Sequence, residues 1–370
     1  MSVGTPQTDV VANGAGYGSV AERLIVNGMD AGTLRPYVAE DGRSYVTVNE
    51  EPRIITNAAT LRKDEWVQFD TAVIKAARSR LRAWTDLSTQ SGTYGGFNGM
   101  ASMVLEHESM SDPGEAFVNF DGMVEGRTDT PVFQLEGLPL PITHCDFFFS
   151  ARRLAISRKL GTPIDSAMAE AAGRRVAETI EKMTIGTLAG PNLDPKNVDD
   201  YRRQPKVYGY TNFPDRLTKD DVTPPTDGGW DPSDTIGDVL DALDSLYDNN
   251  FFGPFMVYHS KDWTQYLDND YYKLVSNGAV SPAKTLRNRI REIDGIVDVR
   301  RLDFLDDEFT LLFVQMTPDV ARAVNGMNMT TVQWETMGGM RLNFKVMCIH
   351  VPQLRSDYNG NCGILHATTS

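Results

Sequence analysis

Cysteine and long apolar runs are both scarce in this sequence. Three cysteines among 370 residues cannot form a closed disulfide framework, so a reducing compartment fits the chain best. The longest apolar runs, such as residues 310–316, are far shorter than the ~18 residues that a membrane span requires. Residues 1–14 lack a basic stretch followed by an apolar core, and therefore do not resemble a secretory signal. These absences predict a soluble protein that does not cross a membrane.

Positive charge is also in short supply. There are 36 Lys and Arg against 50 Asp and Glu, which gives a net charge of −14. This balance repels phosphate backbones, so it disfavours nucleic-acid recognition. An apolar content of 41% and a charged content of 23% are ordinary for a folded protein, and the length suffices for two domains. Composition leaves an enzyme and a structural protein as open alternatives.

Catalytic signatures are missing as well. Residues 14–18 read Gly-Ala-Gly-Tyr-Gly, but no strand pattern precedes them, so a flexible arm is a better interpretation than a nucleotide site. No Walker loop or nucleophile-elbow motif occurs, and His107-Glu108 is not followed by the second histidine of a metalloprotease helix. We therefore expect a protein that is not an enzyme and that has no cofactor.

One group of residues has the composition of a metal site. Cys348 and His350 share one face of a predicted strand, while Cys362 and His366 are predicted to lie one helical turn apart. The residue types suit zinc, but the spacings match no common structural site. We therefore expect core packing and no metal here. The alternative is a soluble cytosolic α/β enzyme formed by residues 232–350, and only that alternative includes a zinc ion at these four residues.

The first part of the chain contains one strong helical pattern between glycine-rich stretches. Residues 1–60 are interrupted by glycine before any apolar stretch reaches helical length, which predicts an arm with short strands only. Apolar side chains then recur at spacings of three and four, which predicts a first helix over residues 61–87. The members of this stripe are Trp66, Phe69, Val73, Ala77, Leu81 and Trp84. Residues 88–141 carry strand signals but little apolar mass, which favours a long hairpin that reaches across a neighbour.

A strand region and a long helix follow the predicted hairpin. Residues 142–156 are strongly apolar, with Phe147 and Phe149 expected on one face of a strand and Phe148 on the other. Thr162 is a suitable N-cap for a helix over residues 163–183, which would be roughly 30 Å long. Proline and glycine are then frequent in residues 186–230, which indicates a loop-rich insertion or a boundary.

Helices and strands alternate in the second part of the chain. Asp231 is placed to cap the first of these helices, and a short helix is expected over residues 317–324. Strands at residues 330–335 and 341–351 are expected to close the unit. The pattern of residues 232–350 therefore predicts a compact α/β domain with a mixed sheet.

Half of the net charge lies in the predicted hairpin. Residues 104–140 contain eight acids and one base, Arg127, which gives 1 − 8 = −7. The flanking segments are basic, so we expect the hairpin to dock on another copy of the chain, since opposite charges fix orientation and register. A solvated acidic loop, or packing within one subunit, is the alternative. The candidate contact residues between subunits are Phe117, Phe120, Arg127, Val132, Phe133 and Leu135.

The order of these segments resembles that of the major capsid proteins of tailed bacteriophages and of their relatives, the encapsulin shell proteins. The likeness covers about residues 60–350 and lies in the order and spacing of several stretches, none of which is a strict motif. These are Leu61-Arg62-Lys63-Asp64-Glu65-Trp66, Leu138-Pro139-Leu140-Pro141-Ile142, Phe147-Phe148-Phe149, Gly161-Thr162-Pro163-Ile164-Asp165, Gly253-Pro254-Phe255 and Arg341-Leu342-Asn343-Phe344.

The resemblance implies an α+β fold with an N-terminal arm, an extended β-hairpin loop, a peripheral domain with a long spine helix, and an α/β axial domain. The implied bounds are 1–60 for the arm, 61–87 for the first helix of the peripheral domain, 88–141 for the extended loop, 142–231 for the peripheral domain with its spine helix at 163–183 and its Pro-rich insertion, 232–345 for the axial domain, and 346–370 for a C-terminal strand and tail.

The resemblance also implies a function. Pentamers and hexamers of such a protein assemble into an icosahedral shell around double-stranded phage DNA, which is held without sequence-specific binding. The implied partners are other copies of the chain, together with scaffolding, portal and decoration proteins, in the host cytoplasm during assembly and then in the virion. The alternative is an encapsulin compartment around a cargo enzyme, but the arm and the insertion at residues 186–230 favour the viral protein.

Two chemical features of some relatives are not expected here. Some join their subunits through a lysine on the extended loop, but no lysine occurs between Lys75 and Lys159. Some lose a long helical N-terminal segment during maturation, whereas the arm of this chain is rich in glycine. We therefore expect neither that crosslink nor an internal cleaved segment.

Overall fold

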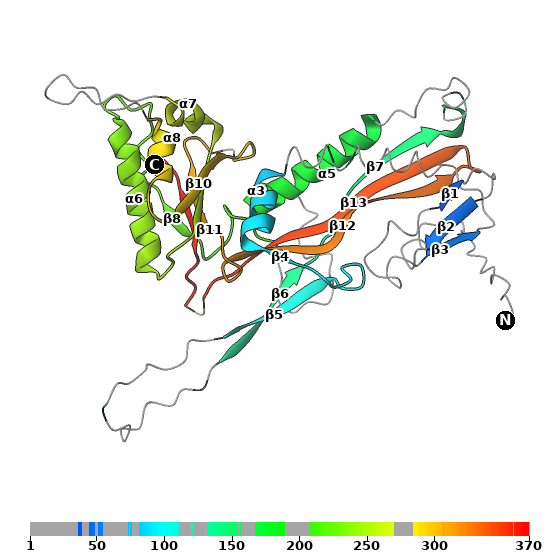
Figure 1. Ribbon diagram of the computed structural model, residues 1–370, viewed down its shortest axis with the longest axis horizontal. Helices are drawn as coiled ribbons and strands as arrows, with labels where there is room; N and C mark the ends of the chain where they lie inside the picture. Colours follow the sequence, from blue (N-terminus) through cyan, green and yellow to red (C-terminus); the bar gives the residue numbers. More distant parts are fainter. Residues whose placement is uncertain are drawn as a thin grey trace, which may run out of the picture.

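A five-stranded sheet and a four-stranded sheet form the two packed units of the protein, and a hairpin projects from one of them (Figure 1). The computed structural model describes residues 36–38, 44–48, 51–54, 73, 75, 81–110, 120, 130, 132–153, 156, 167–188, 207–269, 284–305, 307–357 and 359–369. Among these residues, no helix is both long enough and apolar enough to cross a membrane.

The four-stranded sheet has the order β4-β12-β13-β7. Its centre is the antiparallel pair β12 (Ala321–Thr336) and β13 (Arg341–Leu354). β7 (Thr143–Ser150) pairs antiparallel with β13, and the short β4 (Thr93–Tyr94) pairs parallel with β12. Helix α5 (Ala167–Ile185) packs across β7 and β13 (Figure 1).

The core of this unit lies between α5 and the sheet. The alternation predicted for the strand is confirmed, because Phe147 and Phe149 are buried while Phe148 is about half exposed. Phe147 stacks on Phe344 of β13, with ring centroids 5.2 Å apart. Burying each such side chain contributes roughly 1.5–3 kcal/mol. The strand ends at Ser150, so the predicted strand region 142–156 is too long: the backbone is helical at residues 151–153.

The long helix α5 presents a buried stripe to the same core. Ala172, Val176, Ile180 and Met183 are all at most 3% exposed, at the three- and four-residue spacing seen in the sequence. α5 ends at Ile185, and residues 163–166 of the predicted range lie outside the described residues.

The first helix differs from its prediction. Val73 and Lys75 are helical, but Leu81 is not, with φ −88° and ψ 78°, and a separate helix α3 (Arg82–Asp86) begins after it. α3 continues into a π-helical turn, η2 (Leu87–Ser91). The prediction of one continuous helix over residues 61–87 was therefore wrong at Leu81. Periodicity did not reveal the break because the group that caps α3 comes from α5, far along the chain.

The five-stranded sheet has the order β10-β9-β11-β14-β8 and is mixed, as predicted. β9 is parallel to β10 and antiparallel to β11, while β14 is antiparallel to β11 and parallel to β8. The strands are β8 (Leu217–Lys219), β9 (Phe255–His259), β10 (Ile296–Arg301), β11 (Leu311–Gln315) and β14 (Ile364–Ala367).

Helices α6 (Pro232–Asp248), α7 (Thr264–Leu267) and α8 (Leu286–Arg291) accompany this sheet, together with the 3₁₀ turn η5 (Lys261–Trp263). The cap predicted at Asp231 is confirmed, because its side chain accepts from Ser233 N and its own backbone N donates to the Asp234 carboxylate.

The second unit contains other strands than those expected from the sequence. The segments expected to close it, residues 330–335 and 341–351, belong to β12 and β13 of the other sheet. β14 and β8 complete the five-stranded sheet instead. The short helix predicted for residues 317–324 is also wrong, since a turn at 318–320 leads directly into β12. Both errors concern pairing between distant segments, which a local sequence pattern does not specify.

The Pro-rich insertion and the arm are described in part. Tyr210, from the insertion, is fully buried in a hydrophobic cluster that contains side chains of both units, so this part of the insertion is more than a surface loop. In the arm, β1 (Pro36–Val38), β2 (Ser44–Val48) and β3 (Glu51–Ile54) form an antiparallel three-stranded sheet. The other residues of the arm lie outside the described part of the chain.

Candidate functional site

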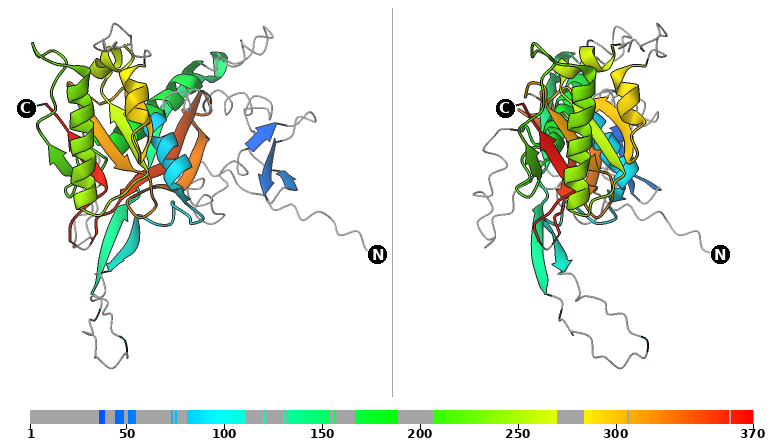
Figure 2. Two further views of the ribbon diagram at one scale, coloured as in Figure 1. Left: turned by 60° about the vertical axis from the view of Figure 1, so that its left-hand side comes forward. Right: turned by 90° about the vertical axis from the view of Figure 1, so that its left-hand side faces the viewer.

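The projecting hairpin is the candidate functional site. It consists of β5 (Val104–Met110) and β6 (Phe133–Pro139), which pair antiparallel from Val104 opposite Pro139 to Met110 opposite Phe133. Among the described strands these two pair only with each other, and Figure 2 shows them extending away from both sheets. The hairpin predicted within residues 88–141 is therefore present, and its described strands lie at residues 104–110 and 133–139.

The base of the hairpin is anchored in the body. Leu105, Leu138 and Leu140 pack in a cluster with side chains of β12 and β13, and Leu140 N donates to Met103 O at 2.8 Å. At Gly137 a Cβ atom would lie 3.0 Å from Val104 Cγ1, so a side chain there would crowd the paired strand. The base is therefore part of the fold, whereas the outer part of the hairpin extends beyond it.

Apolar side chains are exposed on the outer part. Val132, Phe133 and Leu135 are 54%, 60% and 45% exposed, and Phe120 is fully exposed. Phe133 and Leu135 share one face of β6, and the exposed Glu106 and Glu108 lie on the paired strand. The candidates Phe117 and Arg127 lie outside the described residues. An exposed face of mixed apolar and acidic side chains suits a protein contact better than catalysis.

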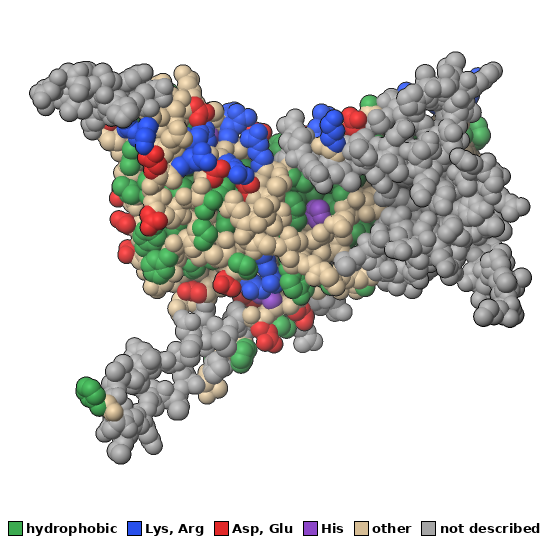
Figure 3. Space-filling model, in the orientation of Figure 1, with side chains coloured by type: hydrophobic (Ala, Val, Ile, Leu, Met, Phe, Trp, Pro, Cys, Tyr) green, Lys and Arg blue, Asp and Glu red, His purple; other side chains and the backbone are tan. Residues whose placement is uncertain are grey.

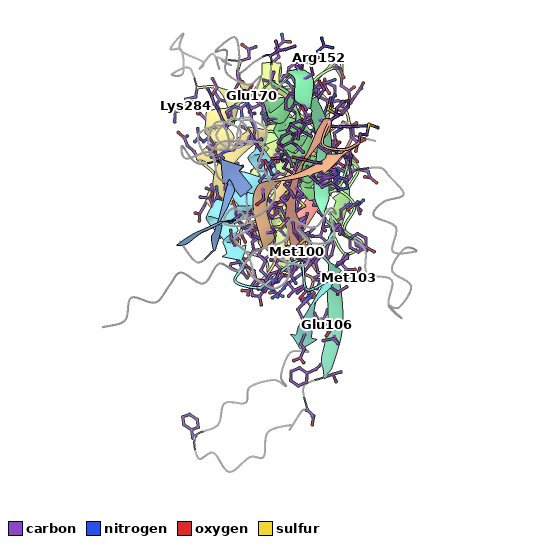
Figure 4. All side chains as sticks on the ribbon, turned by 90° about the vertical axis from the view of Figure 1, so that its right-hand side faces the viewer. Met100, Met103, Glu106, Arg152, Glu170 and Lys284 are labelled. Carbon is purple, nitrogen blue, oxygen red and sulfur yellow. The ribbon has the colours of Figure 1, made fainter. Side chains whose placement is uncertain are left out.

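The hairpin and the basic segments of the body are far apart within one chain. In Figure 4, Glu106 lies on the hairpin at one end of the molecule, and Arg152 lies at the other end of the body. Arg152 and Arg153 are exposed, as are Arg174 and Arg175 on α5. Glu106 therefore cannot pair with Arg152 in the same copy, although the two can meet between copies.

A second polar cluster, which the sequence did not indicate, lies between the two units. The Glu181 carboxylate accepts from the backbone N atoms of Arg82, Ala83 and Trp84 at 3.1, 2.7 and 3.3 Å. It therefore caps α3 from another helix, at the positive end of the α3 dipole. Burial raises the pKa of Glu181 to about 7, although the three N–H donors oppose the shift.

The same cluster reaches the five-stranded sheet through Asp86. Its carboxylate accepts from Tyr258 Oη of β9 at 3.1 Å and pairs with Arg300 of β10. Burial raises the pKa of Asp86, and the guanidinium of Arg300 opposes that shift. Tyr210 stacks on Tyr258, with ring centroids 6.2 Å apart. Asp86 of α3 thus meets β9 and β10 and joins the two units through polar contacts, while Glu181 of α5 holds the start of α3.

The four residues of the possible zinc site are distributed over both units. Cys348 lies on β13 with its Sγ 3.9 Å from Thr143 O, and the His350 ring stacks on Trp84 at 4.9 Å. Cys362 donates to Arg355 O at 3.4 Å, and His366 belongs to the strand β14, so these two are not one helical turn apart. Within the described part of the chain, no group of three or more His, Cys, Asp or Glu is placed to hold a metal ion.

Burial keeps the two buried thiols and His350 uncharged. It raises the pKa of Cys348 and of Cys362 to about 12, and it lowers the pKa of His350 to about 4. All three pKa shifts oppose the charged form, which is the behaviour of core residues.

The family model described as "Family of unknown function (DUF6260)" matches residues 56–367. The chain belongs to this family. The match spans the hairpin, both sheets and helices α3 to α8 of this DUF6260 member. A comparison with curated proteins finds no match.

Solved structures show which fold this member of the family has. It is similar to the capsid of Myoviridae phage XM1 (TM-score 0.53, 12% identity, covering 77% of this chain and 92% of that one). It is also similar to the capsid of the native GTA particle (TM-score 0.52, 12% identity, 78% and 91%). The virus-like particle from Pyrococcus furiosus gives a TM-score of 0.51 at 14% identity, with coverage of 82% and 98%. The α+β fold of capsid proteins, inferred from the order of the segments, is therefore confirmed.

Proposed function

We propose that this protein is a major capsid protein. Many copies assemble as pentamers and hexamers into an icosahedral shell that encloses the double-stranded DNA of a phage. The observation that carries the proposal is the hairpin, whose outer part exposes Phe133 and Leu135 beyond the core of its own chain. Exposure of such an apolar face to water is unfavourable. In the assembled shell a neighbouring subunit covers it.

The charges of the chain support the same proposal. Glu106 of the hairpin and Arg152 of the body lie far apart in one copy, so a contact between them would join two copies. A net charge of −14 suits a container that holds DNA without binding it tightly to its wall. Shell formation requires neither a catalytic residue nor a cofactor, and we propose that the protein is not an enzyme.

The second candidate is an encapsulin compartment that encloses a cargo enzyme. The observation that favours it is the similarity to the virus-like particle from Pyrococcus furiosus, of which 98% is covered. Residues 1–60 and the insertion that buries Tyr210 favour the phage protein, since we expect encapsulins to lack most of both.

Electron microscopy of the purified full-length protein tests both candidates. The capsid proposal predicts closed shells of large diameter that contain nucleic acid when they are isolated from infected cells. Small shells filled with a ferritin-like or peroxidase protein would support the encapsulin instead. A stable monomer or dimer at micromolar concentration, even with other virion proteins present, would reject both and would leave an α/β enzyme as the remaining candidate.

A further inference from the structure

The unit built on the five-stranded sheet has an acidic side. Residues 215–250 contain ten acids and two bases, Arg216 and Lys219, a difference of 2 − 10 = −8. Many of these acids are exposed along α6 and in the loop after β8, and we call this surface the acidic face. It consists of Asp220, Asp221, Asp241, Asp244 and Asp248.

Among the described residues, Lys219 is shared between two acids of the acidic face. Lys219 Nζ lies 3.6 Å from Asp221 Oδ2 and 3.7 Å from Asp241 Oδ2, so one ammonium group serves two carboxylates. Burial raises the pKa of the adjacent Asp238, and repulsion from Asp221 and Asp241 adds to the shift. Leu240 is 44% exposed within this surface, so an apolar contact accompanies the charges. A cationic partner surface would relieve this repulsion.

A basic surface lies on another side of the same unit. Residues 284–301 hold six bases and three acids, a difference of 6 − 3 = +3. We call the guanidinium groups of α8 and of the edge strand β10 the arginine edge. It consists of Arg289, Arg291, Arg300 and Arg301. In Figure 3 basic side chains gather over this part of the unit, while acidic side chains follow the border where α6 lies.

The arginine edge retains capacity for further carboxylates. Asp298 accepts from both Arg291 at 3.0 Å and Arg300 at 2.8 Å, and Arg300 also pairs with Asp86. The side chains of Arg291 and Arg300 remain 46% and 43% exposed. A guanidinium carries five N–H donors in a fixed plane, so an exposed one can bind a second carboxylate beside its present partner.

We propose that the acidic face of one copy packs on the arginine edge of the next copy around a ring of subunits. This inference rests on the proposed shell function and specifies which surfaces meet. The two surfaces belong to different sides of one unit, so the contact is head-to-tail, and its repetition by rotation closes a ring. A second copy is a better occupant than a metal ion, because the described residues of this face contain no group placed to hold one.

Charge reversal tests the contact in the full-length chain. Asp241→Lys with Asp244→Lys places like charges across the contact, as does Arg289→Glu with Arg291→Glu. Each double variant is expected to assemble at least about tenfold more slowly than the wild type, with a folded far-UV circular dichroism spectrum. A chain that carries all four substitutions restores opposite charges and should regain most of the wild-type rate.

Mixing the two double variants gives a sharper result. Favourable contacts in a 1:1 mixture require the two proteins to alternate around the ring, and alternation closes only rings with an even number of subunits. The mixture should therefore form six-membered rings but not five-membered rings, which native mass spectrometry distinguishes.

Several outcomes would overturn the inference without affecting the shell proposal. One such outcome is that the wild type forms shells while the variant with all four substitutions folds correctly but does not form them. Another is unchanged or faster assembly of Asp241→Asn with Asp244→Asn, which removes charge with little change of shape and should slow assembly. Failure of the wild type itself to associate would overturn both proposals.

Discussion

At the scale of single residues, Glu181 shows how one side chain joins parts of the fold that are distant in sequence. It lies on α5, caps α3 with three backbone hydrogen bonds, and is 2% exposed. Leu81 leaves the helical conformation immediately before this cap. The break in the first helix and the buried carboxyl group are therefore two aspects of one arrangement.

The free energy of unfolding should depend on the protonation of Glu181. Its folded pKa of about 7 lies above the ordinary value of 4.5, so the stabilising contribution is complete below about pH 4.5 and is lost as the pH rises through 7. The shift corresponds to roughly 3 kcal/mol at most. Glu181→Gln should remove this dependence, since the neutral amide oxygen still accepts from the N–H groups. Urea unfolding between pH 5 and 8 measures how the free energy of unfolding of each protein depends on pH.

The matched control for Glu181 is Glu170→Gln, which changes an exposed glutamate of the same helix. It should leave the slope of stability against pH unchanged. Equal slopes for the wild type and Glu181→Gln would show that the buried carboxyl does not titrate in this range.

The close backbone approach at Gly209 leads to a second prediction at the scale of single residues. A Cβ atom there would lie 2.3 Å from Gly186 N, so the two backbones touch where the insertion joins the end of α5. Gly209→Ala should lower the free energy of unfolding by about 1–3 kcal/mol or more, because backbone atoms must move. The control, Gly228→Ala, adds a methyl group in open space. Calorimetry that finds equal melting temperatures for both variants would contradict this close approach.

At the scale of elements, the hairpin separates into a base that folds with the body and an outer part that does not. Leu105 and Leu138 belong to a buried cluster, whereas Phe133 and Leu135 are exposed on the same pair of strands. One element therefore contributes both to the stability of the subunit and, under the proposed function, to its association.

Phe133→Ser with Leu135→Ser should reduce assembly and leave the folded subunit intact. The two side chains are exposed in the subunit, so their removal costs less than about 0.5 kcal/mol of unfolding free energy. Light scattering should show assembly slowed at least tenfold, as expected when apolar anchors of an interface are removed. Ile142→Ser, at an exposed apolar position outside the hairpin, is the control. Normal assembly of the hairpin variant would reject the contact.

The pattern of side chains within an element was largely readable from the sequence. Phe147 and Phe149 alternate with Phe148 because successive side chains of a strand point to opposite faces. Asp231 caps α6 because a carboxylate satisfies free N–H groups of the first turn. Both effects act over a few residues. The sequence pattern placed β12 and β13 in the wrong unit, in contrast, because the pairing of β13 with β7 joins distant segments.

At the scale of the whole molecule, a shortened hairpin separates folding from assembly. His107 and Glu136 lie opposite each other, so Asn-Gly in place of residues 108–135 closes a tight turn and keeps Leu105 and Leu138 in the core. The product should be a folded monomer that forms no closed shells. Size-exclusion chromatography and electron microscopy measure this. Shells of normal size would show that the outer hairpin is ordinary surface.

Salt should weaken the association of subunits if acidic and basic surfaces meet between copies. Exposed charges are screened over a Debye length of about 8 Å near physiological ionic strength and about 3 Å at 1 M. Assembly followed by light scattering should therefore slow as NaCl rises from 0.05 to about 1 M. A rate independent of salt would remove the electrostatic part of both proposals and would leave the fold unaffected.

The sequence by itself determined the acidic excess of the hairpin, much of the helix and strand pattern of both units, and the order of segments that indicated a capsid fold. These features depend on composition and on contacts between near neighbours. Only the tertiary structure decided that Glu181 caps α3, that β8 and β14 complete the five-stranded sheet, and that Glu106 of the hairpin lies far from Arg152. Those features require segments far apart in the chain to meet, and the free energy of such contacts depends on the whole fold rather than on any local pattern.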